Sequence, residues 1–176
     1  MDGRPISGHQ FREALAHFAS GVTVVAARTT KGLVGFTATG FTSASLTPPL
    51  VLVCVGKSAS AHDGVVSAER FGVSVLCDGQ EWIAEQFARS GIDRFRDVAL
   101  RPGGVPLVEG ALVQLECRRH ARYDAGDHTI LLGQALDGFI CAARPLVRFA
   151  RRFGSFAGES AHRPIDAAVN TAGLGR

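Results

Sequence analysis

The chain has 176 residues, of which 46% are hydrophobic and 20% are charged, and its formal net charge is +3. These values predict one globular domain with its own core and exclude an intrinsically disordered chain. The small positive charge does not indicate a nucleic-acid-binding surface, and no apolar run reaches the roughly 18 residues of a membrane-spanning helix. We expect a cytoplasmic protein with neither nucleic acid nor a membrane as its partner.

The cysteines and the N-terminal segment support the same expectation. None of the cysteines has the C-x-x-C spacing that is typical of zinc sites, and each lies in an apolar run. We expect free thiols, without a metal site or a disulfide. The N-terminal "MDGRPISGHQ" contains no apolar stretch, so no secretory signal is expected. The cysteines are Cys54, Cys77, Cys117 and Cys141.

The first expected element is an amphipathic helix that begins after Ser7. Ser7 and Gln10 have the spacing of a capping box, in which each side chain bonds the backbone N–H of the other residue. Gly21 is expected to end the helix. The apolar residues recur at helical intervals and form one face: Phe11, Ala14, Leu15, Phe18 and Ala19.

Strands are expected to make up most of the remaining domain. Residues 22–28 and 33–39 flank a turn at 29–32 and predict a hairpin, whereas the apolar run 49–55 predicts a strand buried on both faces. Asp78 and Glu81 have the spacing of a second capping box, before a short helix that ends at Gly91. Further strands are expected at 70–77, 111–123, 128–142 and 145–153, with an irregular surface loop at 92–110.

This order of elements predicts the fold class. About seven strands, mostly joined as hairpins, together with two or three short helices, are typical of an antiparallel barrel with helical caps. The periodicity ends near Gly154, so we expect one domain over residues 1–156 and a flexible tail over 157–176.

A run of small residues beside the expected strand 49–55 is the first candidate site. It contains hydroxyl side chains and residues small enough for a flat ring to approach the backbone closely. A Ser/Thr-rich edge strand with solvated hydroxyl groups would have the same composition. The candidate ligand residues are Thr37, Ala38, Thr39, Gly40, Thr42 and Ser43.

A second candidate lies at the other end of that strand, in "GKSASAH". A cation, hydroxyl groups and an expected helix N-terminus could bind a phosphate, although the Walker A pattern is absent. An ordinary N-cap at Ser58 or Ser60 beside an exposed lysine is the alternative. Taken together, the two runs suggest a phosphorylated aromatic cofactor lying along the strand. The residues proposed for the phosphate are Lys57, Ser58, Ser60 and His62.

Several blocks in this order resemble the flavin reductase family over about residues 8–156. The blocks are "GFTATGFTSASLTPPLVLVCVGKSASAH", "FGVSVL", "GQEWIAEQFA", "VEGALVQLEC", "AGDHTILLGQ" and "PLVRF". The resemblance implies an FMN-binding split β-barrel and an NAD(P)H:flavin oxidoreductase, similar to the reductase components of two-component flavin monooxygenases. FMN or FAD, NADH or NADPH, a homodimer and a monooxygenase partner are therefore expected.

The resemblance also implies roles for single residues. Residues 37–43 would hold the isoalloxazine ring, with a backbone-only contact at Gly40, where many relatives carry Ser or Asn. His128 would place the nicotinamide, and Asp127 would shape the turn before it. Phe95 and Phe153 would border the flavin, although Phe95 would equally suit a core anchor and relatives usually carry Tyr near Phe153.

Hydride transfer from nicotinamide C4 to flavin N5 needs no acid–base pair from the protein. Three alternatives remain at this point. A flavin store or sensor would need no nicotinamide site, and a flavoenzyme acting on an organic substrate could use the same barrel. A DNA-binding role for the arginines at 144–152 would require salt-sensitive duplex binding.

Overall fold

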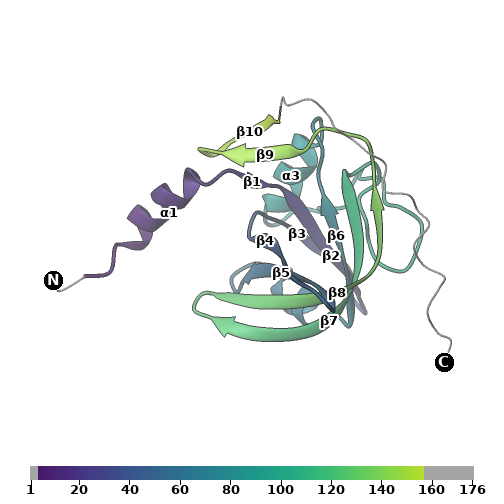
Figure 1. The fold of residues 1–176 in the computed structure, drawn as a ribbon. Helices are drawn as coiled ribbons and strands as arrows, with labels where there is room; N and C mark the ends of the chain where they lie inside the picture. The colour runs from purple at the N-terminus through teal and green to yellow at the C-terminus, as the bar shows by residue number, and fades with distance from the viewer. Residues whose placement is uncertain (1–3, 157–176) are drawn as a thin grey trace.

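The computed structural model describes residues 4–156, so the tail predicted for 157–176 lies outside the described residues. Within the described range the chain is mainly antiparallel β-structure with short helices, which confirms the expected fold class (Figure 1). The helices are α1 (Gly8–Ala16), α2 (His62–Ser67) and α3 (Glu81–Ala88). The strands are β1 (Ser20–Gly21), β2 (Thr23–Thr29), β3 (Gly32–Ala38), β4 (Phe41–Leu46), β5 (Pro49–Gly56), β6 (Arg70–Val75), β7 (Val113–Ala125), β8 (His128–Ile140), β9 (Leu146–Phe149) and β10 (Arg152–Ser155).

Seven of the strands form one curled antiparallel sheet in the order β3-β2-β6-β7-β8-β5-β4. Its two edge strands, β3 and β4, follow each other directly in the chain. At their junction the carbonyl of Gly40 accepts a hydrogen bond of 2.8 Å from the N–H of Cys54 in β5. The barrel is therefore split between β3 and β4, and this seam lies at the run of small residues.

The sheet carries a hydrophobic cluster on each face. One cluster fills the inside of the curl and includes Val25, Val53 and Phe71, all with no exposed surface. The other lies under α3 and the segment 92–111, and includes Leu76 and Phe87, which are also fully buried. Covering both faces in this way fixes β3 between the inner core and α3.

The hairpin and the long paired strands agree with the sequence expectations. β2 and β3 pair from Thr23↔Ala38 to Thr29↔Gly32, as the turn residues predicted. β7 and β8 pair over almost their whole length around the turn at Gly126. The strand at 49–55 is confirmed. The expectation that it is buried on both faces is wrong, because burial alternates along β5 and only one set of side chains faces the core.

Other expectations at element ends were wrong. The strand expected at 145–153 is two strands, β9 and β10, joined by a turn at Ala150 and Arg151. The cap expected at Asp78 is absent, because α3 begins after Gln80 without a side-chain cap hydrogen bond. The opening helix has the predicted capping box between Ser7 and Gln10 but ends at Ala16, well before Gly21.

The segment 92–110 is irregular as expected, but much of it is not on the surface. Its apolar residues Val98, Val105, Leu107 and Val108 are buried. A Cβ on Gly72 in β6 would stand 2.2 Å from the carbonyl oxygen of Pro106, so the segment lies directly on the sheet at a position where no side chain fits. Its Pro and Gly residues concealed this apolar packing in the sequence.

Helix α1 projects away from the rest of the molecule (Figure 1). It buries none of its residues: Phe11 in the helix is 56% exposed, and Phe18, two residues after the helix ends, is 70% exposed. The small sheet β1-β9-β10 lies next to the end of α1. No helix within residues 4–156 has the length and apolar character needed to cross a membrane.

Candidate functional site

The seam between β3 and β4 presents backbone rather than large side chains. Ala38 is buried, and its carbonyl accepts a hydrogen bond of 2.9 Å from the hydroxyl of Thr23 in β2. The hydroxyl of Thr37 donates a hydrogen bond of 2.6 Å to the carbonyl of Ala84 in α3, which ties the strand to the helix. Thr39 and Gly40 are exposed at the strand end. A ring at this seam would therefore meet backbone groups, with the Thr37 hydroxyl oxygen still able to accept.

Gly40 has a structural reason to lack a side chain. A Cβ at this residue would stand 3.1 Å from the Cβ of Cys54, so the space beside Gly40 is filled by β5. The predicted contact of Gly40 with a ring can only come from its outer backbone face. Thr42 and Ser43 lie on the edge strand β4 with exposed side chains, in the arrangement that the alternative of an edge strand also predicts.

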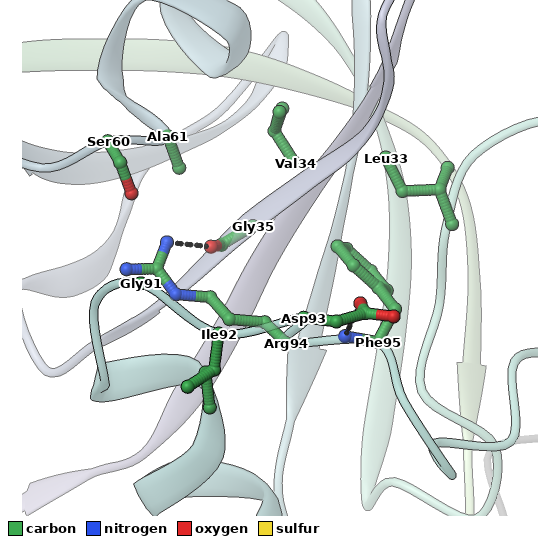
Figure 2. Close-up of a pocket in the computed structure, with 10 residues that line it drawn as sticks. All are labelled: Leu33, Val34, Gly35, Ser60, Ala61, Gly91, Ile92, Asp93, Arg94 and Phe95. Atoms are coloured by element: carbon green, nitrogen blue, oxygen red, sulfur yellow. Dashed lines mark hydrogen bonds between the residues drawn. The ribbon is translucent and has the colours of Figure 1, made fainter.

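A pocket of about 230 Å³ lies between β3, the start of α2 and the segment 91–95 (Figure 2). Ser60 and Arg94 line it from opposite segments, and the Ser60 hydroxyl is directed toward the guanidinium of Arg94 (Figure 2). Arg94 donates to the carbonyl of Gly35 at 2.9 Å and to that of Arg89 at 2.7 Å. Burial lowers the pKa of Arg94 from its ordinary value. An arginine side chain remains cationic in proteins.

This pocket has the chemistry of a phosphate site. A positioned guanidinium presents several N–H donors in a fork that matches phosphate oxygens. The Ser60 hydroxyl makes no hydrogen bond within residues 4–156. Helix α2 begins after Ala61, and no side chain caps its N-terminus. The N-cap alternative for Ser58 and Ser60 is therefore wrong, and both hydroxyl groups remain available to a ligand.

The other residues predicted for the phosphate lie apart from Arg94. Lys57 donates to the carboxylate of Asp124 and, at 2.6 Å, to the carbonyl of Gly126, so its charge serves the β7–β8 turn. The Nε2 atom of His62 lies 2.9 Å from the hydroxyl of Thr129 in β8. These contacts bring Lys57 and His62 to the β8 side of β5, and neither residue lines the pocket of Ser60.

A second pocket, of about 630 Å³, contains His128. Thr39, directly after β3, and Arg148 of β9 line it together with exposed side chains of α1. The Nδ1 atom of His128 lies 2.7 Å from the carboxylate of Asp127. This hydrogen bond, together with the charge of His128, lowers the pKa of Asp127. An ionised Asp127 accepts, so Nδ1 donates and Nε2 is left for other contacts near Gly56.

Strand β3 connects the two pockets. Leu33, Val34 and Gly35 line the pocket of Arg94, and Thr39 lines the pocket of His128. Gly35 and Thr39 are four residues apart, which corresponds to about 13 Å along an extended strand. The chain thus places the pocket of Arg94 and the pocket of His128, which also contains arginines, near the two ends of β3.

The two phenylalanines occupy different places. Phe95 is half-buried, meets Phe87 edge-to-face with ring centroids 4.9 Å apart, and also lines the pocket of Arg94. It is therefore both a core anchor and a pocket wall. Phe153 of β10 packs on the outer cluster, with the guanidinium carbon of Arg148 5.5 Å from its ring centroid.

The sequence interpretation missed Arg94 and Arg148. Arg94 directly precedes Phe95, which the resemblance had already pointed to, so the motif "DRF" was the available signal. Nothing local in the sequence shows that its guanidinium returns to β3. Arg148 was grouped with the arginines at 144–152 as a basic cluster, and only the fold shows that it lines the pocket of His128, together with Arg151.

The sequence of this chain matches the model of a known protein family. The model of the flavin reductase like domain matches residues 15–157. The chain belongs to the flavin reductase family. This membership confirms the resemblance stated from the sequence blocks.

Two curated members of the flavin reductase family are similar over most of their length. The FMN reductase (NADH) SmoA of Agrobacterium fabrum is 41% identical over 152 residues, 85% of this chain and 87% of that protein. The NADH-dependent FAD reductase of Streptomyces globisporus is 43% identical over 156 residues, 84% of this chain and 85% of that protein.

Solved structures of flavin reductases have the same fold. The NADH:FAD oxidoreductase of Streptomyces globisporus, in complex with NAD and FAD fragments, superposes with a TM-score of 0.82 at 39% identity. The alignment covers 90% of this chain and 99% of that one. The flavin reductase component of a bacterial two-component tryptophan halogenase superposes with a TM-score of 0.79 at 36% identity, covering 85% and 98% of the two chains.

Proposed function

We propose that this flavin reductase transfers a hydride from NADH to FMN or FAD and supplies the reduced flavin to a partner monooxygenase. The relatives support the reaction, since they are named as NADH-dependent FMN and FAD reductases. The partner class is supported by a relative from Thermus thermophilus, the reductase component of 4-hydroxyphenylacetate 3-monooxygenase. It is 48% identical over 123 residues, 70% of this chain and 78% of that protein.

One observation carries the assignment to this chain. Strand β3 runs from the pocket of Arg94 and Ser60 to the pocket of His128, with the seam between them. FMN and FAD each join a flat ring to a negatively charged phosphate, so they fit this order of features along one strand. We place its phosphate at Arg94 and Ser60 and its ring at residues 37–43, within reach of His128.

When bound, flavin supplies the electron acceptor N5 for the hydride that leaves C4 of the nicotinamide. The protein residues hold and orient, because the transfer needs stacking distance and alignment more than a protein acid or base. His128 borders the ring on the side of its pocket and positions the nicotinamide, while Asp127 fixes the imidazole through Nδ1. The ion pair of Lys57 with Asp124 holds the β7–β8 turn from which His128 projects.

The exposed face of α1 supports a homodimer. A nine-residue helix is marginal in water unless its apolar face is packed, and α1 buries none of its residues within this chain. Its side chains also form one wall of the His128 pocket. A second copy that covers Phe11, Leu15 and Phe18 would bury this face and would close the nicotinamide site. The cytoplasmic location expected from the sequence stays a prediction.

The test is a steady-state assay of the purified full chain. NADH and NADPH oxidation is followed with FMN, FAD or riboflavin added singly, and the initial rates are fitted to ping-pong and sequential schemes. Flavin-dependent oxidation of NADH supports the reductase. Flavin binding without oxidation of either nucleotide would identify a store or sensor instead, and NADH oxidation only with an added organic substrate would identify another flavoenzyme.

A further inference from the structure

Helix α1 is attached to the strands at the turn between β9 and β10. The side chain of Arg151 in this turn forms an ion pair with Glu13 of the helix. The N–H of Ala150 donates a hydrogen bond of 2.7 Å to the carbonyl of Ala16, the last residue of the helix. Within residues 4–156, every hydrogen bond and ion pair that links α1 to a later part of the chain comes from this turn.

The turn has a backbone conformation that its residues rarely adopt. Ala150 and Arg151 have positive φ values of 47° and 64°, although neither is glycine. Such a conformation persists only where its surroundings hold it in place. The contacts with α1 provide that support, and the imidazole of His17 adds to it by meeting Phe149 edge-to-face with ring centroids 6.0 Å apart.

The helix held by this turn is also one wall of the pocket of His128. Phe11 and Leu15 of α1 line that pocket, and so does Arg151, whereas Glu13 does not. A helix of nine residues that buries none of them has little stability of its own. The position of this wall therefore depends on the contacts that α1 makes with the β9–β10 turn.

We propose that Glu13 and Arg151 are positioning residues for NADH, because their ion pair fixes α1 as a wall of the pocket of His128. The inference rests on the proposed function, in which this pocket receives the nicotinamide. A wall that is already in place does not have to be ordered when the nucleotide binds, so more of the contact energy appears as affinity. Breaking the ion pair should weaken NADH binding and leave the hydride transfer itself unchanged.

The first test is Glu13→Gln in the full chain, assayed with NADH at saturating FMN. We expect KM for NADH to rise about twofold to fivefold, as for the loss of one partly exposed ion pair, with kcat and Kd for FMN unchanged. The direction of the change distinguishes positioning from simple electrostatics. Removing a negative charge near the site of an anionic nucleotide would by itself lower KM.

Arg152→Gln is the matched control. Arg152 is exposed at the start of β10, forms no ion pair within residues 4–156 and does not line the pocket of His128. It removes a positive charge from the same hairpin without touching the contact with α1. KM for NADH should therefore stay at the wild-type value in this variant.

Amide hydrogen exchange, read by mass spectrometry, tests the contact without any assay of activity. Exchange over residues 8–17 should be faster in Glu13→Gln than in the wild type, because α1 is released more often. The reversed pair Glu13→Arg/Arg151→Glu should bring it back toward the wild-type rate. An unchanged or lower KM for NADH in Glu13→Gln, or an unchanged exchange rate of α1, would overturn the inference and leave the reductase in place. If the wild type oxidises NADH with no flavin, the proposed function fails, and the positioning role fails with it.

Discussion

Replacing Arg94 with alanine should weaken the binding of FMN strongly and the binding of riboflavin only slightly. The guanidinium is half-buried, lies in the pocket with Ser60 and is fixed by hydrogen bonds to the carbonyls of Gly35 and Arg89. A charge-assisted hydrogen bond contributes about 1.5–3 kcal/mol, so we expect Kd for FMN to rise about tenfold to a hundredfold. Riboflavin has no phosphate, so the affinity of the protein for riboflavin should change little.

The comparison of the two flavins separates phosphate binding from loop structure. Arg94→Ala also removes two hydrogen bonds that hold the segment 91–95, and a loosened segment would weaken FMN and riboflavin alike. Arg96→Ala is the matched control. Arg96 directly follows this segment and its side chain is 80% exposed, so the substitution should leave both Kd values unchanged. Flavin fluorescence titrations measure the affinities, and thermal unfolding reports the fold. The phosphate assignment is refuted if Arg94→Ala binds FMN as tightly as the wild type does. It is also refuted if Kd rises by the same factor for FMN and for riboflavin.

Three further outcomes are expected. His128→Ala should raise KM for NADH about tenfold, as expected for the loss of one or two hydrogen bonds, and leave Kd for FMN unchanged; an unchanged KM in initial-rate assays would remove His128 from the nicotinamide site. Phe18→Glu should shift the protein from dimer to monomer in light scattering, because it puts a charge on the exposed apolar surface formed by α1 and the residues directly after it; an unaltered mass would contradict the role of this surface. In thiol titration of the native protein at pH 8, exposed Cys141 should react rapidly and Cys117 only after unfolding, since burial raises the pKa of Cys117 to about 12 and keeps it a neutral thiol; rapid reaction of both would contradict the packing around Cys117.

Local patterns in the sequence were sufficient to predict elements that depend on turn residues and on the spacing of neighbouring side chains. The β2–β3 hairpin follows from its turn residues, and the capping box at Ser7 follows from side-chain spacing. The turn between β9 and β10 could not be found in this way. It is made by Ala150 and Arg151 at positive φ of 47° and 64°, a conformation that the sequence signals through Gly or Asn.

The candidate site was predictable where it follows the chain and not where it joins distant segments. The small residues at 37–43 and the hydroxyl groups of Ser58 and Ser60 stand out because each group is contiguous in the sequence. Arg94 comes to the pocket of Ser60 through hydrogen bonds to the carbonyl of Arg89 and to that of Gly35, 59 residues earlier in the chain. Lys57, in contrast, was expected at the phosphate because it is adjacent to Ser58, yet its side chain turns to Asp124.

The central claim is that a flavin lies along β3, with its ring on the seam and its phosphate at Arg94. A crystal structure of the protein grown with excess FMN tests this most directly. The account predicts isoalloxazine density against the backbone of residues 37–40 and phosphate density within hydrogen-bonding distance of Arg94 and Ser60. Density for FMN at another surface, with the seam filled by the protein's own side chains, would contradict it.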